Sequence, residues 1–430
     1  MINKLKYIFH RGSYRKVLQK SSLLFVFHDK SSIEQYQIDK FNEVWEDAYK
    51  NIPFFKEWKD TYKLPSSISS LSELSNWPVL TKKDILEEIK NVKRDVPPTG
   101  KVITSGSTGV PLNLPVWHDE ETQSNMWIGR AANGILPDDK TFLIWGHHHL
   151  YGTGLTRIKN IIIRSVKDII LGYKRISAYD TSEPAMMAAL KKYEKFKPAF
   201  VIGYSSSVLS FVRCNKKRGV KNHPKLVLCT AGPLSDKEKE EIREFFSCPL
   251  CMEYGSVECG VMAYTVNDCN CYKTFWTSHL LQGKKDTNGK IRNLVTKLSK
   301  NYFPLIRYDI GDYLDIPEGE SLDSILNINT ILGRPTDVVT LDNGVSFFAM
   351  LIEACVEHLE GLISHQLLVK GNSLEILLVA LRHLDENDFN SVLKKLQAVV
   401  PNLNNCDIVI KQVDELNKNK GGKTPLVIRL

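Results

Sequence analysis

Short apolar runs alternate with longer polar segments of helical length over most of the chain. Four of the runs have the length and composition of buried strands. They lie at 142–145, 200–202, 226–228 and 249–252. Apolar side chains recur at helical spacing in 31–50, 183–195 and 235–246. This alternation predicts an α/β fold whose layers contain mostly parallel sheets.

The last hundred residues show a different pattern, which indicates a separate small α+β unit. A hairpin at 337–348 turns at Asp342-Asn343-Gly344 and is followed by helix, strand, strand, helix and strand. These elements are expected near 349–359, 365–370, 374–381, 386–400 and 406–410, before a polar tail at 412–424. We place the joint at Gly333-Arg334-Pro335, so an N-terminal domain of 1–332 precedes a C-terminal domain of 333–430.

Composition and charge narrow the class of protein. The 430 residues are 43% hydrophobic and 25% charged, which is typical of a soluble globular protein and excludes disordered, collagenous and small disulfide-rich chains. The net charge of +8 is spread out, so we expect acidic small molecules as partners and no nucleic acid. Nine cysteines without paired spacing indicate a reducing compartment, hence a cytoplasmic protein.

The first twenty residues are basic. They contain Lys4, Lys6, Arg11, Arg15, Lys16 and Lys20, and the first acidic residue is Asp29. A solvated first helix is the favoured interpretation. The alternative is a weak peripheral contact of residues 1–20 with an anionic membrane, which would place the protein at the inner membrane surface.

A run of hydroxyl and glycine residues forms the most informative segment, Thr104-Ser105-Gly106-Ser107-Thr108-Gly109. Its backbone N–H groups and hydroxyls suit an anion such as phosphate, and its glycines allow close approach. It lacks the Gly-Lys-Ser/Thr ending of a Walker A loop. A flexible linker is the alternative interpretation of this segment.

Further motifs follow this loop in a recognisable order. They are Ala231-Gly232-Pro233, Tyr254-Gly255-Ser256-Val257-Glu258, Tyr308-Asp309-Ile310-Gly311-Asp312, Gly333-Arg334 and Gly422-Lys423. The ordered set resembles the adenylate-forming ligase superfamily, most closely the phenylacetate–coenzyme A ligase-like branch and its capsule-biosynthesis relatives. The resemblance covers roughly residues 30–430 and implies an ATP-binding N-terminal domain with a mobile C-terminal lid.

The resemblance implies a role for each matching residue. Ser105, Gly106, Ser107, Thr108 and Gly109 would bind the phosphates of ATP. Glu258 would hold Mg²⁺, for which carboxylate oxygens are suitable ligands; its alternative is a solvated carboxylate. Tyr254, followed by Gly255 and Ser256, would enclose adenine with Ala231, Gly232 and Pro233. Asp312 would accept hydrogen bonds from the ribose, Arg334 would contact nucleotide and lid, and Lys423 would bridge the substrate carboxylate and the α-phosphate.

The acyl pocket is expected around 145–154, a segment that resembles the aromatic and glycine-rich lining of this branch. We expect its lining to include His148, His149, Tyr151, Gly152, Tyr204 and Gly255. A histidine that steers the substrate carboxylate is favoured over a metal cluster, because neighbours in an extended segment point to opposite faces. His149 therefore joins Lys423, Glu258 and Thr108 as an expected catalytic residue.

Two features leave alternatives open. Val257 replaces the usual Thr or Ser, Thr336 replaces a usual Asp or Lys, and the Arg usual three residues after the lid lysine is absent; together they keep a non-catalytic nucleotide-binding homologue as an alternative. Cys259, Cys269, Cys271 and His279 have spacing that zinc sites use, but nearby cysteines lie at a predicted buried strand, so Zn²⁺ is the less favoured interpretation.

The expected activity is therefore an ATP- and Mg²⁺-dependent ligase. It would convert a small carboxylic or amino acid into its acyl-adenylate with release of pyrophosphate. The acyl group would then pass to an amine or hydroxyl of an amino sugar or sugar nucleotide in surface-polysaccharide synthesis. Transfer to coenzyme A, as in the phenylacetate-type ligases, is the alternative.

Overall fold

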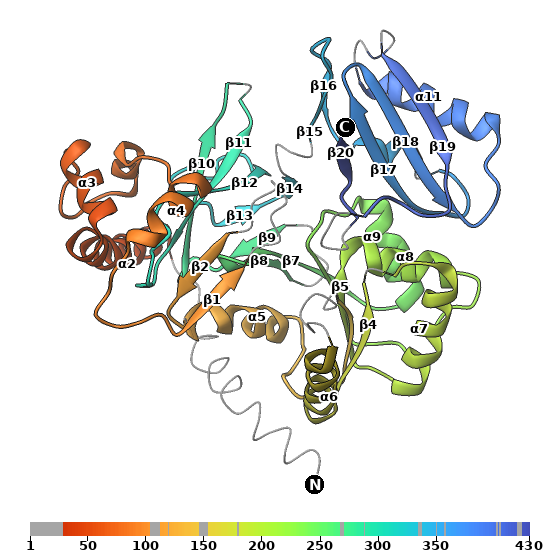
Figure 1. Cartoon of the computed structure of the whole chain (residues 1–430), viewed down its shortest axis with the longest axis horizontal. Coiled ribbons are helices and arrows are strands. Elements are labelled where there is room, and N and C mark those ends of the chain that lie inside the picture. Colours follow the sequence, from red (N-terminus) through yellow and green to blue (C-terminus); the bar gives the residue numbers. More distant parts are fainter. Residues whose placement is uncertain are drawn as a thin grey trace. The chain divides into compact units, whose positions relative to one another are not determined.

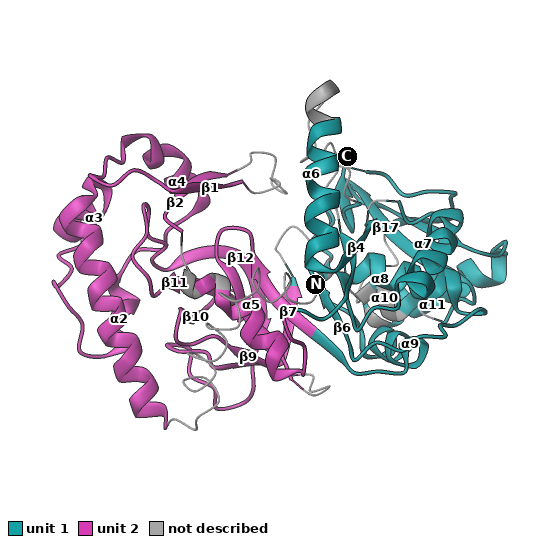
Figure 2. Cartoon of the chain, turned by 90° about the horizontal axis from the view of Figure 1, so that it is seen from below, with its two compact units in different colours: residues 1–10, 138–251, 333–430 teal, residues 11–137, 252–332 magenta. Residues whose placement is uncertain are grey.

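A computed structural model describes most of the chain from residue 29 onward (Figure 1). The described residues are 29–103, 112–118, 120–145, 154–178, 180–266, 271–287, 289–333, 338–349, 351–356, 358–400, 403, 406–418 and 424–430. They form two compact units, one made of the described residues within 138–251 and 333–430 and one of those within 29–137 and 252–332 (Figure 2). The chain passes from the first unit to the second within strand β7, Leu250–Ser256.

The first unit contains a parallel sheet in the order β6-β5-β3-β4. Its strands are β3 (Thr141–Trp145), β4 (Tyr173–Ser177), β5 (Phe200–Tyr204) and β6 (Leu226–Thr230). The connecting helices are α6 (Gly154–Leu171), α7 (Glu183–Phe196), α8 (Ser205–Asn215) and α9 (Asp236–Phe246). Nearly every residue of β5 and β6 is buried, as expected for strands covered on both faces. The predicted α/β fold with parallel pairing is confirmed here.

The register of this sheet brings four strand ends to one edge. Trp145 pairs with Ser177, and Tyr204 pairs with Thr230, so the carboxyl ends of β3, β4, β5 and β6 lie together. Ligands of α/β proteins bind outside the carboxyl ends of parallel strands. This edge is therefore where the fold of the first unit places binding residues.

The C-terminal part of the first unit has its own sheet, in the order β19-β18-β17-β20. Its elements are β15 (Val338–Thr340), β16 (Ser346–Phe348), α10 (Leu351–Val356), β17 (Leu362–Lys370), β18 (Ser373–Ala380), α11 (Glu386–Val399), β19 (Asp407–Gln412) and β20 (Val427–Arg429). The buried residues of its core lie within 339–403, among them Leu367, Ile376 and Leu396, and partly buried side chains as far as Val427 pack against them. The order of elements follows the expected one, with β20 as an addition that the sequence pattern did not indicate.

Within the first unit, Arg213 of α8 connects this C-terminal part to α9. Its guanidinium donates to both carboxylate oxygens of Glu241, at 3.1 and 3.3 Å, and lies 3.7 Å from a carboxylate oxygen of Glu238. The same side chain donates to the carbonyl oxygen of Ile363 on β17, at 3.5 Å. The buried guanidinium of Arg213 is thus paired with a carboxylate of α9 and also hydrogen-bonded to the C-terminal sheet.

The second unit is mixed, with antiparallel sheets and an aromatic helical core. Its helices are α2 (Lys30–Asn51), α3 (Pro53–Thr61), α4 (Lys82–Glu88) and α5 (Glu120–Ala132), with 3₁₀ turns at Leu71–Asn76 and Ile89–Asn91. Its strands are β1 (Gly100–Ile103), β2 (Asn113–Val116), β8 (Gly260–Thr265), β9 (Tyr272–Thr274), β10 (His279–Lys285), β11 (Ile291–Lys297), β12 (Tyr308–Asp315), β13 (Asn327–Ile328) and β14 (Thr330–Gly333). The helix expected at 31–50 is α2, and its buried face holds Phe41 and Trp45, which pack edge-on against Trp77.

None of the helices in the described ranges is both long enough and apolar enough to span a bilayer.

Candidate active site

In the first unit, residues at the carboxyl ends of β3, β5 and β6 contact one another. The rings of Trp145 and Tyr204 lie with centroids 4.6 Å apart. Ser205, which begins α8, donates its hydroxyl to the carbonyl oxygen of Gly232 at 2.7 Å. The carbonyl oxygen of Thr230 is a second acceptor for this hydroxyl, at 3.2 Å. The turn that contains the predicted adenine residues is therefore attached to the helix that follows Tyr204.

Ala231 has a backbone conformation that is unusual for a residue with a side chain. Its φ of +64° lies in the left-handed region, where a Cβ atom costs about 1 kcal/mol or more. Strained conformations of this kind cluster at functional sites, where the surrounding structure holds them, although helix ends adopt them too. This observation supports a binding role for the Ala231-Gly232-Pro233 turn, which the sequence motif also indicates.

In the second unit, two predicted nucleotide residues are joined directly. The phenol of Tyr254, on β7, donates to Oδ2 of Asp312, on β12, at 2.8 Å. Asn293 donates its side-chain N–H to the Tyr254 oxygen at 3.0 Å, and all three side chains are buried. Burial, and next the charge of Asp312, raise the pKa of Tyr254 well above its usual value, so the phenol stays protonated and acts as a donor.

Gly255 follows Tyr254 where β7 and β8 come unusually close. A Cβ atom at this position would lie 2.3 Å from the carbonyl oxygen of Gly260. Only glycine permits this approach, and the turn from 256 to 260 follows from it. Ser256 accepts a hydrogen bond from the backbone N–H of Cys259 at 3.1 Å, which closes the turn around Glu258.

Glu258 is held at this turn by a residue of another motif. The hydroxyl of Tyr308 donates to Oε1 of Glu258 at 3.3 Å. Tyr308 begins β12, four residues before Asp312, so this strand contains one predicted acidic residue of the site and contacts the other. Glu258 is partly exposed, and its carboxylate offers the oxygen ligands that Mg²⁺ prefers. The Glu258 carboxylate is thus chemically suited to a magnesium ion.

A buried chain of hydrogen bonds supports the same turn from behind. Nε2 of His279 lies 2.9 Å from the carbonyl oxygen of Cys259, and Nδ1 lies 3.1 Å from the hydroxyl of Ser278. Asn125 in turn donates to Ser278 at 2.7 Å. Because a carbonyl only accepts, Nε2 carries a proton, while Nδ1 lies beside the Ser278 hydroxyl, which also donates to the carbonyl oxygen of Phe275 at 3.2 Å. Both ring nitrogens of His279 are used in this way, so its geometry is that of a turn support rather than of a zinc ligand.

The side chains that could ligate a zinc ion do not gather at one point of the described chain. In the part of the chain that the structure describes, three or more His, Cys, Asp or Glu side chains nowhere converge as a metal site would require. Cys259 is buried, and burial raises the pKa of its thiol, which disfavours the thiolate that zinc binds. Cys269 lies outside the described residues.

Several predicted residues lie outside the described part of the chain. They are Ser105, Gly106, Ser107, Thr108, Gly109, His148, His149, Tyr151, Gly152, Arg334 and Lys423. The predicted loop at 104–109 lies between β1 and β2, whose register pairs Ile103 with Asn113. Sequence reasoning missed Asn125, Ser278 and Asn293, since polar residues within strands and helices carry no motif of their own. It included Tyr308 in a motif but assigned it no role.

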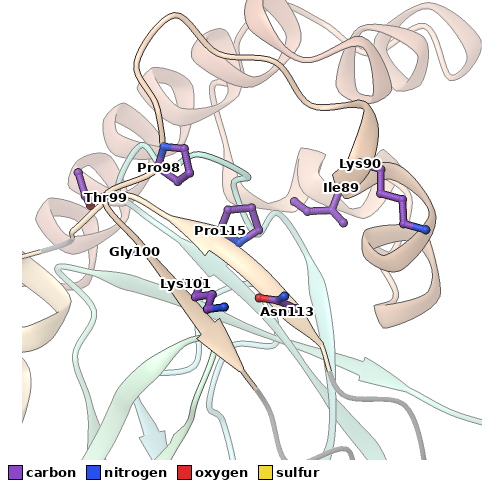
Figure 3. Close-up of a pocket in the computed structure, with 8 residues that line it drawn as sticks. All are labelled: Ile89, Lys90, Pro98, Thr99, Gly100, Lys101, Asn113 and Pro115. Carbon is purple, nitrogen blue, oxygen red and sulfur yellow. The ribbon is translucent and has the colours of Figure 1, made fainter. Parts of the chain in front are cut away.

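A surface cavity of about 510 Å³ lies at the β1–β2 hairpin (Figure 3). It is lined by Ile89, Lys90, Pro98, Thr99, Gly100, Lys101, Asn113 and Pro115. None of the predicted nucleotide or acyl residues is among them. The cavity therefore shares no lining residue with the Tyr254–Asp312 cluster.

Comparison with known proteins identifies the fold. No model of a known protein family matches the chain. Protein CapK of Staphylococcus aureus is 21% identical over 377 residues, which cover 84% of this chain and 81% of CapK. Indoleacetate–lysine synthetase of Pseudomonas savastanoi is 28% identical over 116 residues, or 26% of this chain and 28% of the synthetase.

A solved structure is similar over nearly the whole length. The crystal structure of 2-hydroxyisobutyryl-CoA ligase in complex with its acyl-adenylate, 2-HIB-AMP, matches with a TM-score of 0.70 at 14% identity. The match covers 93% of this chain and 90% of that ligase. The chain therefore has the fold of the adenylate-forming ligases, and the resemblance to this superfamily that the ordered motifs indicated is confirmed.

Proposed function

We propose that this chain is a ligase that activates a small carboxylic or amino acid as its acyl-adenylate. ATP would be the second substrate, and pyrophosphate the first product. The acyl group would then pass to an amine or hydroxyl acceptor. The proposal rests on one observation above all: residues 254 and 312, from two distant motifs, form a buried hydrogen-bonded pair beside the Glu258 turn.

Each side chain of this cluster has a chemical task in that reaction. Asp312 would accept hydrogen bonds from the ribose hydroxyls while Tyr254 fixes the direction of its carboxylate. Tyr254 and the Ala231-Gly232-Pro233 turn would enclose adenine. Glu258 would hold Mg²⁺, which when bound supplies positive charge to the phosphates of ATP.

The remaining negative charge of the phosphates and the substrate carboxylate would be met by residues that the sequence predicts and that lie outside the described part of the chain. Ser105, Gly106, Ser107, Thr108 and Gly109 would donate hydrogen bonds to the phosphates. Lys423 would place its ammonium between the substrate carboxylate and the α-phosphate, which repel each other as they approach. Arg334 would contact the nucleotide, and His149 with His148 would steer the acid.

The C-terminal residues 333–430 would act as a lid that brings Lys423 to the nucleotide. Their independent hydrophobic core supports this assignment, since a domain that moves must stay folded by itself. The hydrogen bond from Arg213 to the carbonyl of Ile363 would then be one of the contacts that such a movement exchanges.

An amine or hydroxyl acceptor in surface-polysaccharide synthesis is the preferred second half of the reaction. CapK is similar over most of both chains, and the name of indoleacetate–lysine synthetase specifies transfer to an amino acid. An amino sugar or sugar nucleotide would fit this chemistry, and the reaction would take place in the cytoplasm or at the inner membrane surface.

Transfer to coenzyme A is the second candidate, because the matched 2-hydroxyisobutyryl-CoA ligase carries out that chemistry according to its name. Pyrophosphate release would be measured over a panel of acids with ATP and Mg²⁺, with and without coenzyme A. Amino-sugar acceptors form the third arm. Release without coenzyme A that increases with an amino sugar supports the preferred acceptor. A thioester formed from a simple aryl acid would instead support the coenzyme A ligase, and no release with any acid would contradict both.

A further inference from the structure

Helix α6 has its apolar side turned toward solvent. The exposed fractions of Ile158, Ile162 and Ile169 are 57%, 56% and 71%. Ile161, Ile163 and Val166 are exposed as well, so six large apolar side chains of one helix contact water. Positions 158, 162, 166 and 169 recur at helical spacing and therefore form one continuous stripe.

The opposite side of α6 is polar and faces the protein. Asn160, Arg164 and Asp168 recur every four residues, and each is partly buried. Asp168 accepts a hydrogen bond from Arg175 of the neighbouring strand β4 at 2.6 Å. A surface helix normally packs its apolar side on the core and its polar side toward water, so α6, labelled in Figure 2, is reversed.

This reversal requires an explanation outside the described fold. A contiguous exposed apolar surface usually marks a binding surface, whereas single exposed apolar residues do not. The side chains of the stripe are exposed, whereas Asp168 on the opposite side is paired with Arg175 of β4. What covers the stripe is indicated by the charges next to it.

The charged residues beside the stripe are basic. Lys159 and Lys167 of α6 and Lys174 of β4 are exposed. The one acidic residue in the sequence of α6 is Asp168, and it is paired with Arg175. An apolar stripe with basic flanks matches the interface of an anionic bilayer, where acyl chains lie below negatively charged headgroups.

We propose that α6 docks in the headgroup region of an anionic membrane and lies parallel to its surface. Its 18 residues give about 27 Å of helix. Like charge disfavours a second α6 helix as the occupant, since the exposed lysines would meet their own copies. It also disfavours residues 1–28, which carry six Lys or Arg and no acidic residue.

The test is co-sedimentation of the full chain with vesicles, which needs no ligase activity and is therefore independent of the proposed function. Vesicles of phosphatidylcholine alone are compared with vesicles of phosphatidylcholine and phosphatidylglycerol in equal amounts. We expect binding to the second, weakened by high salt because headgroup attraction is screened. The Ile162→Glu/Ile169→Glu double variant should bind at least about ten-fold more weakly. It removes apolar surface and adds negative charges that the anionic headgroups repel.

Matched variants separate this docking from general effects of charge. Leu381→Glu/Val409→Glu places the same charges at two other exposed apolar positions of the first unit and should sediment like the parent. Lys159→Gln and Lys167→Gln should each weaken binding about five-fold. Failure of the parent to sediment with anionic vesicles would overturn the proposal, as would undiminished binding of the Ile162→Glu/Ile169→Glu variant. A change from dimer to monomer in that variant, measured without lipid by analytical ultracentrifugation, would assign the stripe to a second copy instead.

Discussion

The hydroxyl of Tyr254 donates a 2.8 Å hydrogen bond to the carboxylate of Asp312, a residue 58 positions further along the chain. Both side chains are buried, and both belong to motifs that the sequence analysis assigned to the nucleotide. A buried carboxylate is costly unless hydrogen bonds satisfy it, so this pair ties the stability of the second unit to the geometry of the predicted ribose site.

Replacement of Tyr254 by phenylalanine tests this coupling. Tyr254→Phe leaves the Asp312 carboxylate with one donor fewer, and we expect a loss of about 1–3 kcal/mol in the free energy of unfolding. The misdirected carboxylate should also raise the KM for ATP about ten-fold, a difference of about 1.4 kcal/mol. Urea unfolding and pyrophosphate release measure the two effects.

A matched control lies on the same strand as Asp312. Tyr313 donates its hydroxyl to Asp286 at 2.9 Å and has no predicted role in nucleotide binding. Tyr313→Phe therefore removes a comparable Tyr–Asp hydrogen bond and should leave the KM for ATP unchanged. An equal rise in KM in both variants would show that the effect of Tyr254→Phe is not specific to the site.

Glu258→Gln tests the predicted magnesium ligand. The amide keeps the size of the side chain and an acceptor for Tyr308, but it removes the negative charge that attracts the ion. We expect pyrophosphate release at low millimolar Mg²⁺ to fall about 100-fold or more, with partial recovery at higher Mg²⁺. Glu318→Gln, at an exposed turn of the same unit, is the control. Unchanged magnesium dependence in Glu258→Gln would refute the assignment.

Lys423→Ala separates an active ligase from a homologue that only binds nucleotide. Loss of the ammonium should lower the rate of adenylate formation about 100-fold or more, because charge develops between carboxylate and α-phosphate in the transition state. Nucleotide affinity should remain, as measured by calorimetry with a non-hydrolysable ATP analogue. Lys420→Ala, three residues away in the same segment, should behave like the parent. Equal rates in both variants would favour the non-catalytic alternative.

His365 on β17 should make stability depend on pH. Burial lowers the pKa of its imidazole to about 4, Arg213 acts in the same direction, and Glu238 opposes both. The unfolded chain takes up this proton near pH 6.5, whereas the folded chain does so only near pH 4. Between these values the unfolded state binds more protons, so the free energy of unfolding should decrease as the pH falls from 6.5 toward 4.

His365→Gln removes this contribution. Its unfolding midpoint, measured in urea at intervals from pH 7 to pH 4.5, should decline less with acidification than that of the parent. His383→Gln, at an exposed histidine in the same part of the chain, is the control and should follow the parent. A slope in His365→Gln as steep as in the parent would contradict the prediction.

Strands with a continuous apolar run could be predicted from the sequence, and strands interrupted by polar residues could not. The apolar runs at 142–145, 200–202 and 226–228 correspond to β3, β5 and β6, because strands buried on both faces need continuous apolar residues. Strands β10, β11 and β12 were missed. They pair antiparallel and carry partners such as Asn293 and Asp312, and such polar side chains interrupt the apolar pattern of a strand.

The candidate site divides in a similar way. Ala231, Tyr254, Glu258 and Asp312 were found because the resemblance rests on short motifs. Their hydrogen-bond partners were not predicted. Asn293 belongs to no motif, and the bond from Tyr308 to Glu258 depends on strand pairing, although Tyr308 itself begins a motif. The sequence likewise contains the helical apolar spacing of α6, but spacing by itself does not say which side of a helix meets the protein.

By itself, the sequence determined the α/β class of the fold, because strands buried on both faces need continuous apolar residues. The order of the motifs added the resemblance to the adenylate-forming ligases. Tertiary structure alone decided that Tyr254 bonds Asp312, that His279 supports the Glu258 turn, and that α6 turns its isoleucines outward. Each of these depends on contacts between segments far apart in the chain, and their free energy comes from burial and pairing that no local pattern encodes.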